Sequence, residues 1–166
     1  GFFWSMHRRD DPDSVWIQTE TAYIDSLLGT VADDHLNIKA IDKAGGILLA
    51  VIKTGLYQPG QPGIVLLERR RQFGWRQHTV WDFDHARTRP IVLVDAENER
   101  VYVVAGTLKS GSNTLWMKSS SLDNIHFEPG AGKILLTHPD LDRLGNATST
   151  RQNLSGMSDL LVLASD

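Results

Sequence analysis

The chain contains no cysteine. Disulfide bonds, thiol catalysis and thiolate metal sites are therefore excluded, and the composition does not indicate an oxidising or a reducing compartment. Its six histidines show no metal-binding spacing such as HExxH, so we expect no metal site. The sequence also has no GxGxxG or Walker loop, and we expect no cofactor.

Long apolar runs are also missing. No stretch approaches the roughly 20 residues of a transmembrane helix, so we predict no membrane span. Residues 1–13 lack both the basic leader and the apolar segment of a signal peptide. The sequence begins without Met in a strand-like run, which leads us to expect a missing upstream segment. Positive charge is not in excess, because the net charge is −3, and we expect no nucleic-acid partner.

The sequence is rich in short apolar runs. Its 166 residues are 41% hydrophobic and 22% charged, which is typical of one globular domain. Residues 82–140 hold four strand-like runs, each bounded by Asp, Asn, Gly or Ser. These runs are RPIVLVD, RVYVVAGT, NTLWMKSSS and IHFEPGAGKILL. The segment therefore predicts four antiparallel strands in succession.

The same order of strands recurs along the chain. The residues that we align are Ile38 and Ile91 in first strands, 53 apart, and Ile47, Val101 and Leu160 in second strands, 54 and 59 apart. Third strands align Ile64 with Thr114, and the aromatic residues Trp16, Trp75 and Phe127 open the predicted fourth strands. A repeat of four strands without an intervening helical period is typical of blades stacked radially.

The predicted fold is all-β, a β-propeller of four-stranded antiparallel blades, and a β-sandwich is the alternative architecture. Residues 1–166 form one incomplete propeller in this prediction, with an outer half-blade at 1–24, blades at 34–81 and 82–140, and an inner half-blade at 146–166. These divisions amount to three blades, whereas closed rings typically have about four to eight. The chain is thus either a fragment of a longer propeller, which the open sheet edges favour, or half of a six-bladed ring that a second copy completes.

The segment Ser119 to Phe127 carries a local motif. It resembles the Asp-box of sialidase-type propellers, Ser-x-Asp-x-Gly-x-x-Trp, in sequence and in its place between the third and fourth strands. Ser121 and Asp123 match this pattern, Ile125 stands at the glycine position, and Phe127 supplies the aromatic one residue early. The resemblance implies a structural turn, in which the Asp123 carboxylate accepts bonds from backbone N–H groups and does not catalyse.

Longer stretches extend this resemblance over most of the chain. The segments DDHLNIKAID, TRPIVLVDAENERVYVVA and NATSTRQN are similar to sialidase-like repeat segments of bacterial, often secreted, proteins whose activity is undefined. The resemblance implies a propeller fold and an extracellular or cell-surface location, without naming a substrate.

Polar residues at the starts of the innermost strands should line the central channel, where propeller ligands commonly bind. Arginine can bind a carboxylate through two hydrogen bonds, and Asn, Gln and His can bind sugar hydroxyls, so we expect a carbohydrate or a small anionic ligand. The alternative is that these side chains cap turns and hydrate a structural channel. The candidates are Asp33, Asp34, His35, Asn37 and Lys39 in one blade, His85, Arg87 and Arg89 in the next, and Asn146, Thr148, Thr150, Arg151 and Gln152 in the last.

Hydrolysis of a glycosidic bond would require two carboxyl groups, roughly 5–5.5 Å apart for retention or roughly 6.5–9.5 Å apart for inversion. The catalytic candidates near the predicted mouth are Asp33, Asp34, Asp82 and Asp84. Sialidases carry an Arg-Ile-Pro motif and a Tyr–Glu pair, whereas this chain has Arg89-Pro90 and no such pair that we can place, so we do not expect sialidase activity proper. The predicted function is binding or hydrolysis of glycans, and the alternative is a non-catalytic scaffold, adhesion or lectin-like module.

Overall fold

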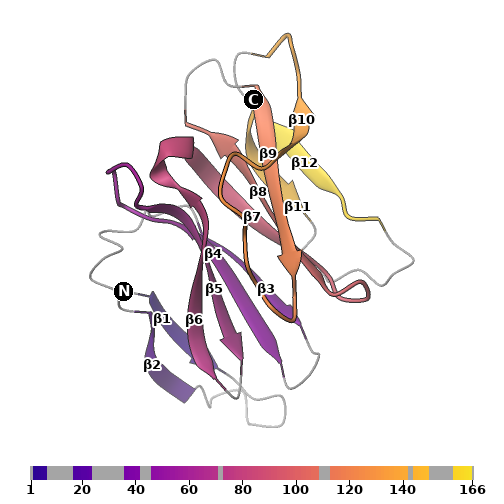
Figure 1. Ribbon diagram of the computed structural model, residues 1–166. Coiled ribbons are helices and arrows are strands. Elements are labelled where there is room, and N and C mark those ends of the chain that lie inside the picture. The colour runs from indigo at the N-terminus through magenta and orange to yellow at the C-terminus, as the bar shows by residue number, and fades with distance from the viewer. Residues whose placement is uncertain are drawn as a thin grey trace.

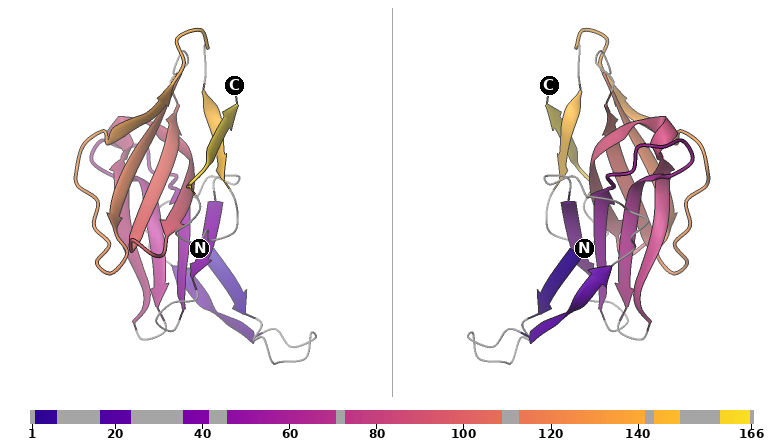
Figure 2. Two further views of the ribbon diagram at one scale, coloured as in Figure 1. Left: turned by 90° about the vertical axis from the view of Figure 1, so that its right-hand side faces the viewer. Right: turned by 90° about the vertical axis from the view of Figure 1, so that its left-hand side faces the viewer.

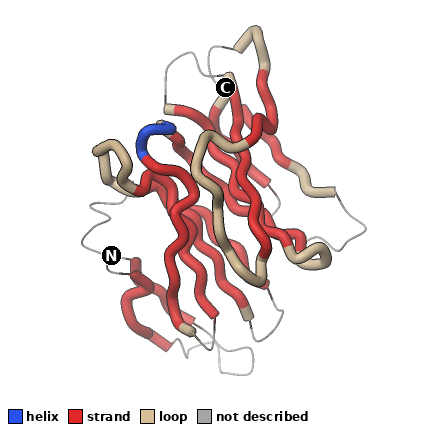
Figure 3. Tube along the Cα trace, viewed as in Figure 1, coloured by secondary structure: helices blue, strands red, loops and turns tan. Residues whose placement is uncertain are grey.

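The computed structural model describes residues 2–6, 17–23, 36–41, 46–70, 73–108, 113–141, 144–149 and 159–165. Strands and connecting loops make up this part of the chain, together with one 3₁₀-helical turn (Figure 3). The elements are β1 (Phe2–Met6), β2 (Ile17–Tyr23), β3 (Leu36–Ile41), β4 (Ile47–Lys53), β5 (Pro62–Arg70), β6 (Gly74–Asp82), the turn η2 (Phe83–His85), β7 (Arg87–Asp95), β8 (Arg100–Thr107), β9 (Thr114–Ser121), β10 (Lys133–Thr137), β11 (Gly145–Ser149) and β12 (Val162–Ser165).

The strands form two antiparallel four-stranded sheets in chain order, which we call the first sheet (β3-β4-β5-β6) and the second sheet (β7-β8-β9-β10). Two antiparallel hairpins, β1-β2 and β11-β12, complete the arrangement (Figure 1). The side views show β11-β12 standing beside the larger sheets (Figure 2). The predicted all-β class and its antiparallel four-stranded sheets are thus confirmed.

Each large sheet is apolar on both faces. On β4, Ile47, Leu49 and Val51 belong to a core cluster that includes residues of the second sheet, whereas Ala50 and Ile52 belong to a cluster on the opposite face. The second sheet likewise contributes one face to the shared core and the other to a cluster with residues of β11 and β12. Because both faces are covered, these strands need apolar side chains at nearly every position, which explains their unbroken apolar runs.

The turns at the start of β4 and β8 fix the register between the two sheets. Gly46 and Glu99 both have positive φ, at 88° and 54°, and each immediately precedes its strand. Ile47 is therefore equivalent to Arg100, 53 residues on, and the alignment of Ile47 with Val101 is wrong by one residue. The side-chain directions agree with this correction. Ile47 and Val101 both face the shared core, so Ile47 points toward the second sheet and Val101 toward the first. Equivalent residues of the two sheets would point the same way.

The same correction applies to the first strands. Asn37 of β3 is equivalent to Ile91 of β7, so the spacing is 54 residues and Ile38 does not align with Ile91. The physical reason is loop length. Residues 42–46 lie between the paired residues Ile41 and Ile47, whereas only residues 96–99 lie between Asp95 and Arg100.

The β11-β12 hairpin repeats the beginning of a sheet. β11 contacts β7 and β8, just as β7 contacts β3 and β4. One extra residue bulges out of β7 between Thr88 and Ile91, and another out of β11 between Gly145 and Thr148. The bulged residues Arg89 and Asn146 both have positive φ, at 51° and 46°, and lie 57 residues apart. β3, β7 and β11 are thus equivalent first strands.

A buried charged cluster joins the outer parts of the two large sheets. The Glu68 carboxylate on β5 accepts hydrogen bonds from Arg70 Nε and, at 2.9 Å, His78 Nε2. Arg70 Nη2 also donates to the carbonyl of Leu122, which follows β9. Burial would raise the pKa of Glu68, but the bonds from His78 and Arg70 bring it below the ordinary value.

The fourth strand of the second sheet begins later than the sequence predicted. Phe127 was expected to open this strand, but β10 starts at Lys133 and residues 122–132 form an irregular loop. Phe127 is instead buried in the shared core with Leu122 and Ile125. An aromatic residue that fills a core from a loop gives the same local pattern as one that opens a strand.

Candidate functional site

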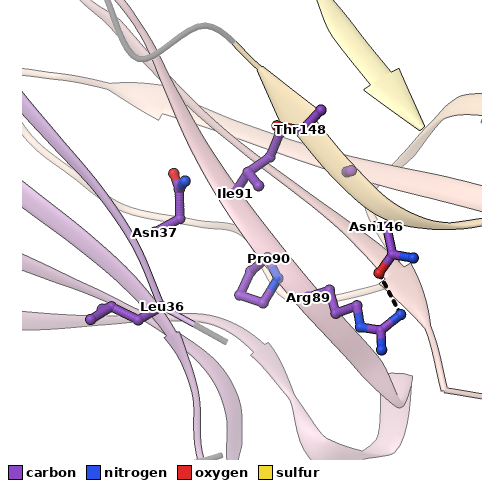
Figure 4. Close-up of a pocket in the computed structure, with 8 residues that line it drawn as sticks. Leu36, Asn37, Arg89, Pro90, Ile91, Asn146 and Thr148 are labelled. Carbon is purple, nitrogen blue, oxygen red and sulfur yellow. Dashed lines mark hydrogen bonds between the residues drawn. The ribbon is translucent and has the colours of Figure 1, made fainter. Parts of the chain in front are cut away.

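A groove of about 330 Å³ lies where β3, β7 and β11 approach one another (Figure 4). Its lining residues fall into three repeat positions. Arg89 and Asn146 occupy the first, Leu36, Pro90 and Ala147 the second, and Asn37, Ile91 and Thr148 the third. The groove is therefore built from the same short segment of three successive first strands.

Backbone bulges give Arg89 and Asn146 their positions at the groove. A bulge adds one residue to a strand and changes the direction of the side chain there. Positive φ at a residue that is neither glycine nor in a common turn costs on the order of 1–3 kcal/mol, so the surrounding structure must stabilise it. Arg89 Nη1 donates a hydrogen bond to Asn146 Oδ1, which links the two bulged residues across the groove (Figure 4).

The polar groups of the groove are mainly hydrogen-bond donors. Asn37 Oδ1 accepts a 3.0 Å bond from the Val92 N–H, and Asn146 Oδ1 accepts the bond from Arg89. Neither NH₂ group bonds to a residue that the structure describes, so each can donate to a ligand. The Thr148 hydroxyl adds a group that can donate or accept, and Arg89 is the one formal charge among the described lining residues. Such a groove suits a ligand rich in acceptor oxygens.

Three other predicted site residues, Asp82, Asp84 and His85, lie outside the groove, in or next to η2. His85 Nδ1 bonds Asp82 Oδ1 at 2.5 Å, and Asp84 Oδ2 accepts a 3.1 Å bond from the Gly60 N–H. Asp84 thus holds the loop between β4 and β5 and is not among the lining residues. Lys39 lies further along β3, where burial lowers its pKa. Asp33, Asp34, His35, Thr150, Arg151 and Gln152 lie outside the described residues.

Arg87 is buried in a cluster of cations and tryptophans. Its guanidinium carbon lies 4.3 Å from the Trp116 ring centroid and 5.8 Å from that of Trp81, and Nη2 donates to the Ala131 carbonyl at 3.2 Å. Lys118 Nζ donates to the carbonyls of Val80 at 2.8 Å and Glu128 at 2.6 Å. Burial lowers the pKa of Arg87 to about 10, so the group remains charged at neutral pH. Aromatic faces and carbonyl dipoles stabilise both cations, which gives Arg87 a packing role.

The Asp-box-like segment follows β9. The hydroxyl of Ser120 accepts a 2.7 Å bond from the His126 N–H, and that of Ser121 accepts a 3.3 Å bond from the Asp123 N–H. Asp123 itself is exposed, and its carboxylate accepts no hydrogen bond from a residue that the structure describes. Serine hydroxyls, together with the burial of Phe127, therefore order this loop.

Sequence reasoning identified Asn37, Arg89, Asn146 and Thr148 but missed the apolar walls, Leu36, Pro90, Ile91 and Ala147. Exact repeat alignment could have found these residues, because Leu36, Pro90 and Ala147 share one repeat position and Ile91 shares the next with Asn37 and Thr148.

Comparison with known proteins gave no match to a family model, a curated protein or a solved structure. In the described segments, no group of three or more His, Asp or Glu side chains could hold a metal ion. No helix in those segments has the length and apolar character needed to cross a membrane.

Proposed function

We propose that this chain is part of a sialidase-like β-propeller that binds glycans in the groove between its first strands. The repeated packing of β7 on β3 and β4, and of β11 on β7 and β8, supports the propeller. A radial stack of blades brings equivalent first strands together around a channel.

The observation that carries the proposal is the composition of the groove. Equivalent positions of β3, β7 and β11 form it, and they present one cation and two amides whose oxygens already have partners. Sugar hydroxyls and carboxylates supply the acceptor oxygens that such donors need.

Binding has more support than hydrolysis. A glycosidase needs two carboxyl groups at the scissile bond, and none occurs among the eight described lining residues. Of the catalytic candidates, Asp84 bonds a backbone N–H and Asp82 bonds His85, while Asp33 and Asp34 lie outside the described residues. A lectin-like module of an extracellular or cell-surface protein is therefore our preferred form of the proposal.

The test is a glycan array with neutral and acidic sugars, followed by calorimetry on any hit. We expect Arg89→Ala to weaken binding at least tenfold and Asn37→Ala to weaken it less. Arg76→Ala is the control, because Arg76 is exposed over the Phe73 ring, outside the groove. Turnover of aryl glycosides would favour a hydrolase instead. An absence of binding to every glycan would favour the scaffold or adhesion module.

A further inference from the structure

The two ends of the stack of sheets expose apolar side chains that equivalent positions bury inside it. On β3, Leu36 and Ile38 are 47% and 53% exposed, whereas Val92, the equivalent of Ile38, is 0% exposed. On β12, Leu163 is 57% exposed, whereas its equivalent Val104 is 1% exposed. Among the residues that the structure describes, each end therefore lacks the neighbour that covers the same face elsewhere in the molecule.

These two uncovered faces are complementary in kind. The face of β7 that carries Val92 packs against β3 and β4 of the first sheet. The matching face of β3 would therefore be covered by the first and second strands of a sheet that precedes it in the stack. The face of β8 that carries Val104 packs against β11. The matching face of β12 would therefore be covered by the first strand of a sheet that follows it in the stack. The β11-β12 hairpin offers the surface that β3 lacks, and β3 offers the surface that β12 lacks.

The sheet edges show the same relation. β8 pairs with β7 on one side and β9 on the other, whereas β12 pairs only with β11 in the described part of the chain. Next to the area that β11 covers, a cavity of about 390 Å³ lies open over Tyr102, Met117 and Lys133. A third strand beyond β12 and the loop after it would cover this area, as β9 and the loop at residues 122–132 cover the outer part of the first sheet. The β1-β2 hairpin is a two-stranded antiparallel unit of the required kind.

We propose that two copies of this chain bind head to tail. The β11-β12 hairpin of each copy packs on β3 of the other, and the partner's β1-β2 hairpin extends the sheet beyond β12. Each copy contributes two complete sheets and two hairpins, so the pair closes into six four-stranded sheets, which is within the range of closed rings. A two-fold axis makes the two joints identical, and this arrangement leaves no sheet edge to pair with further copies. The proposal does not depend on glycan binding.

Sedimentation and light scattering on the purified chain over a range of concentrations test it. We expect twice the 18.5 kDa mass of one chain. Ile38→Glu and Leu163→Lys should each weaken the dimer on the order of a hundredfold, because each places an unpaired charge at both joints. Combining both substitutions in one chain should restore the dimer, since the new opposite charges then meet across each joint.

Phe73→Lys is the control for surface charge, because Phe73 is an exposed apolar residue in the turn between β5 and β6. This variant should remain dimeric. All three positions are exposed in one copy, so circular dichroism should show folded protein for every variant. A monomer at all concentrations would overturn the proposal, as would an open series of larger species or a dimer that Ile38→Glu and Leu163→Lys leave intact.

Discussion

Glu68→Gln should destabilise the chain strongly at neutral pH. The Glu68 side chain is 4% exposed and accepts hydrogen bonds from Arg70 and His78. Charge-assisted hydrogen bonds contribute about 1.5–3 kcal/mol each. The amide oxygen of the glutamine can still accept one of these two hydrogen bonds. Its NH₂ group would face the other donor, so the second bond would be lost. We therefore expect the free energy of unfolding to fall by about 3 kcal/mol, a large part of the roughly 5–15 kcal/mol that stabilises a typical domain.

The pH dependence follows from the lowered pKa of Glu68. A carboxyl group whose pKa is lower in the folded than in the unfolded chain stabilises the fold above the unfolded value, which is 4.5 here. This stabilisation disappears as the pH falls through the lower, folded value. The difference between wild type and Glu68→Gln should therefore be full at pH 7 and shrink below about pH 4.

Urea unfolding followed by tryptophan fluorescence at pH 7 and pH 3 measures this difference. Glu128→Gln is the matched control, because Glu128 also faces a histidine, His126, at 3.4 Å, but its side chain is 86% exposed. An exposed pair contributes about 0–1 kcal/mol, so this control should change little at either pH. Equal effects of the two variants at pH 7, or a Glu68→Gln effect that persists undiminished at pH 3, would refute the reasoning.

Two further substitutions test the second sheet by the same unfolding assay. Gly132→Ala should cost about 1–3 kcal/mol, because a Cβ would lie 2.6 Å from the Met117 carbonyl oxygen at a φ of 84°; Gly130→Ala, at a φ of 104° with no atom within 4 Å, should cost less. Lys118→Met should cost about 1–3 kcal/mol at pH 7 by leaving the carbonyls of Val80 and Glu128 without their donor. Burial lowers the pKa of Lys118, so the folded chain loses this proton first and this lysine's contribution to stability increases as the pH rises toward 10.5. The difference between wild type and Lys118→Met should therefore grow in alkaline solution, and a constant difference would contradict this explanation.

The strands were predictable because turn residues and β-branched runs alternate clearly along the chain. The exact register was not, since the loop at residues 42–46 is one residue longer than the loop at 96–99. The alignment of Ile47 with Val101 therefore contains an error of one residue. Such an error assigns every side chain of a strand to the wrong face of the sheet. Periodicity in a strand that is apolar on both faces cannot reveal such an error.

The groove was predictable in part. Asn37 and Arg89 were identified because polar residues at the starts of the innermost strands should line the central channel of a propeller. The same reasoning failed to predict the burial of Arg87, whose guanidinium packs on Trp81 and Trp116. Trp116 is far from Arg87 in sequence, and the contact forms only when β9 pairs with β8, the strand that lies between β9 and β7. Contacts of this kind depend on the packing of the sheets and leave no local pattern.

The corrected repeat gives one more test of the glycan-binding proposal. Arg89 and Asn146 share a repeat position. The spacing of 54 residues between equivalent positions of β3 and β7 assigns His35, which lies outside the described residues, to the same position. On sequence spacing alone, we expect His35→Ala to weaken binding of an acidic glycan about threefold to tenfold. His126→Ala is the control, because His126 is exposed in the loop after β9. Calorimetry measures the effect. Equal affinities of His35→Ala and wild type would show that the first repeat does not contribute to binding at this position.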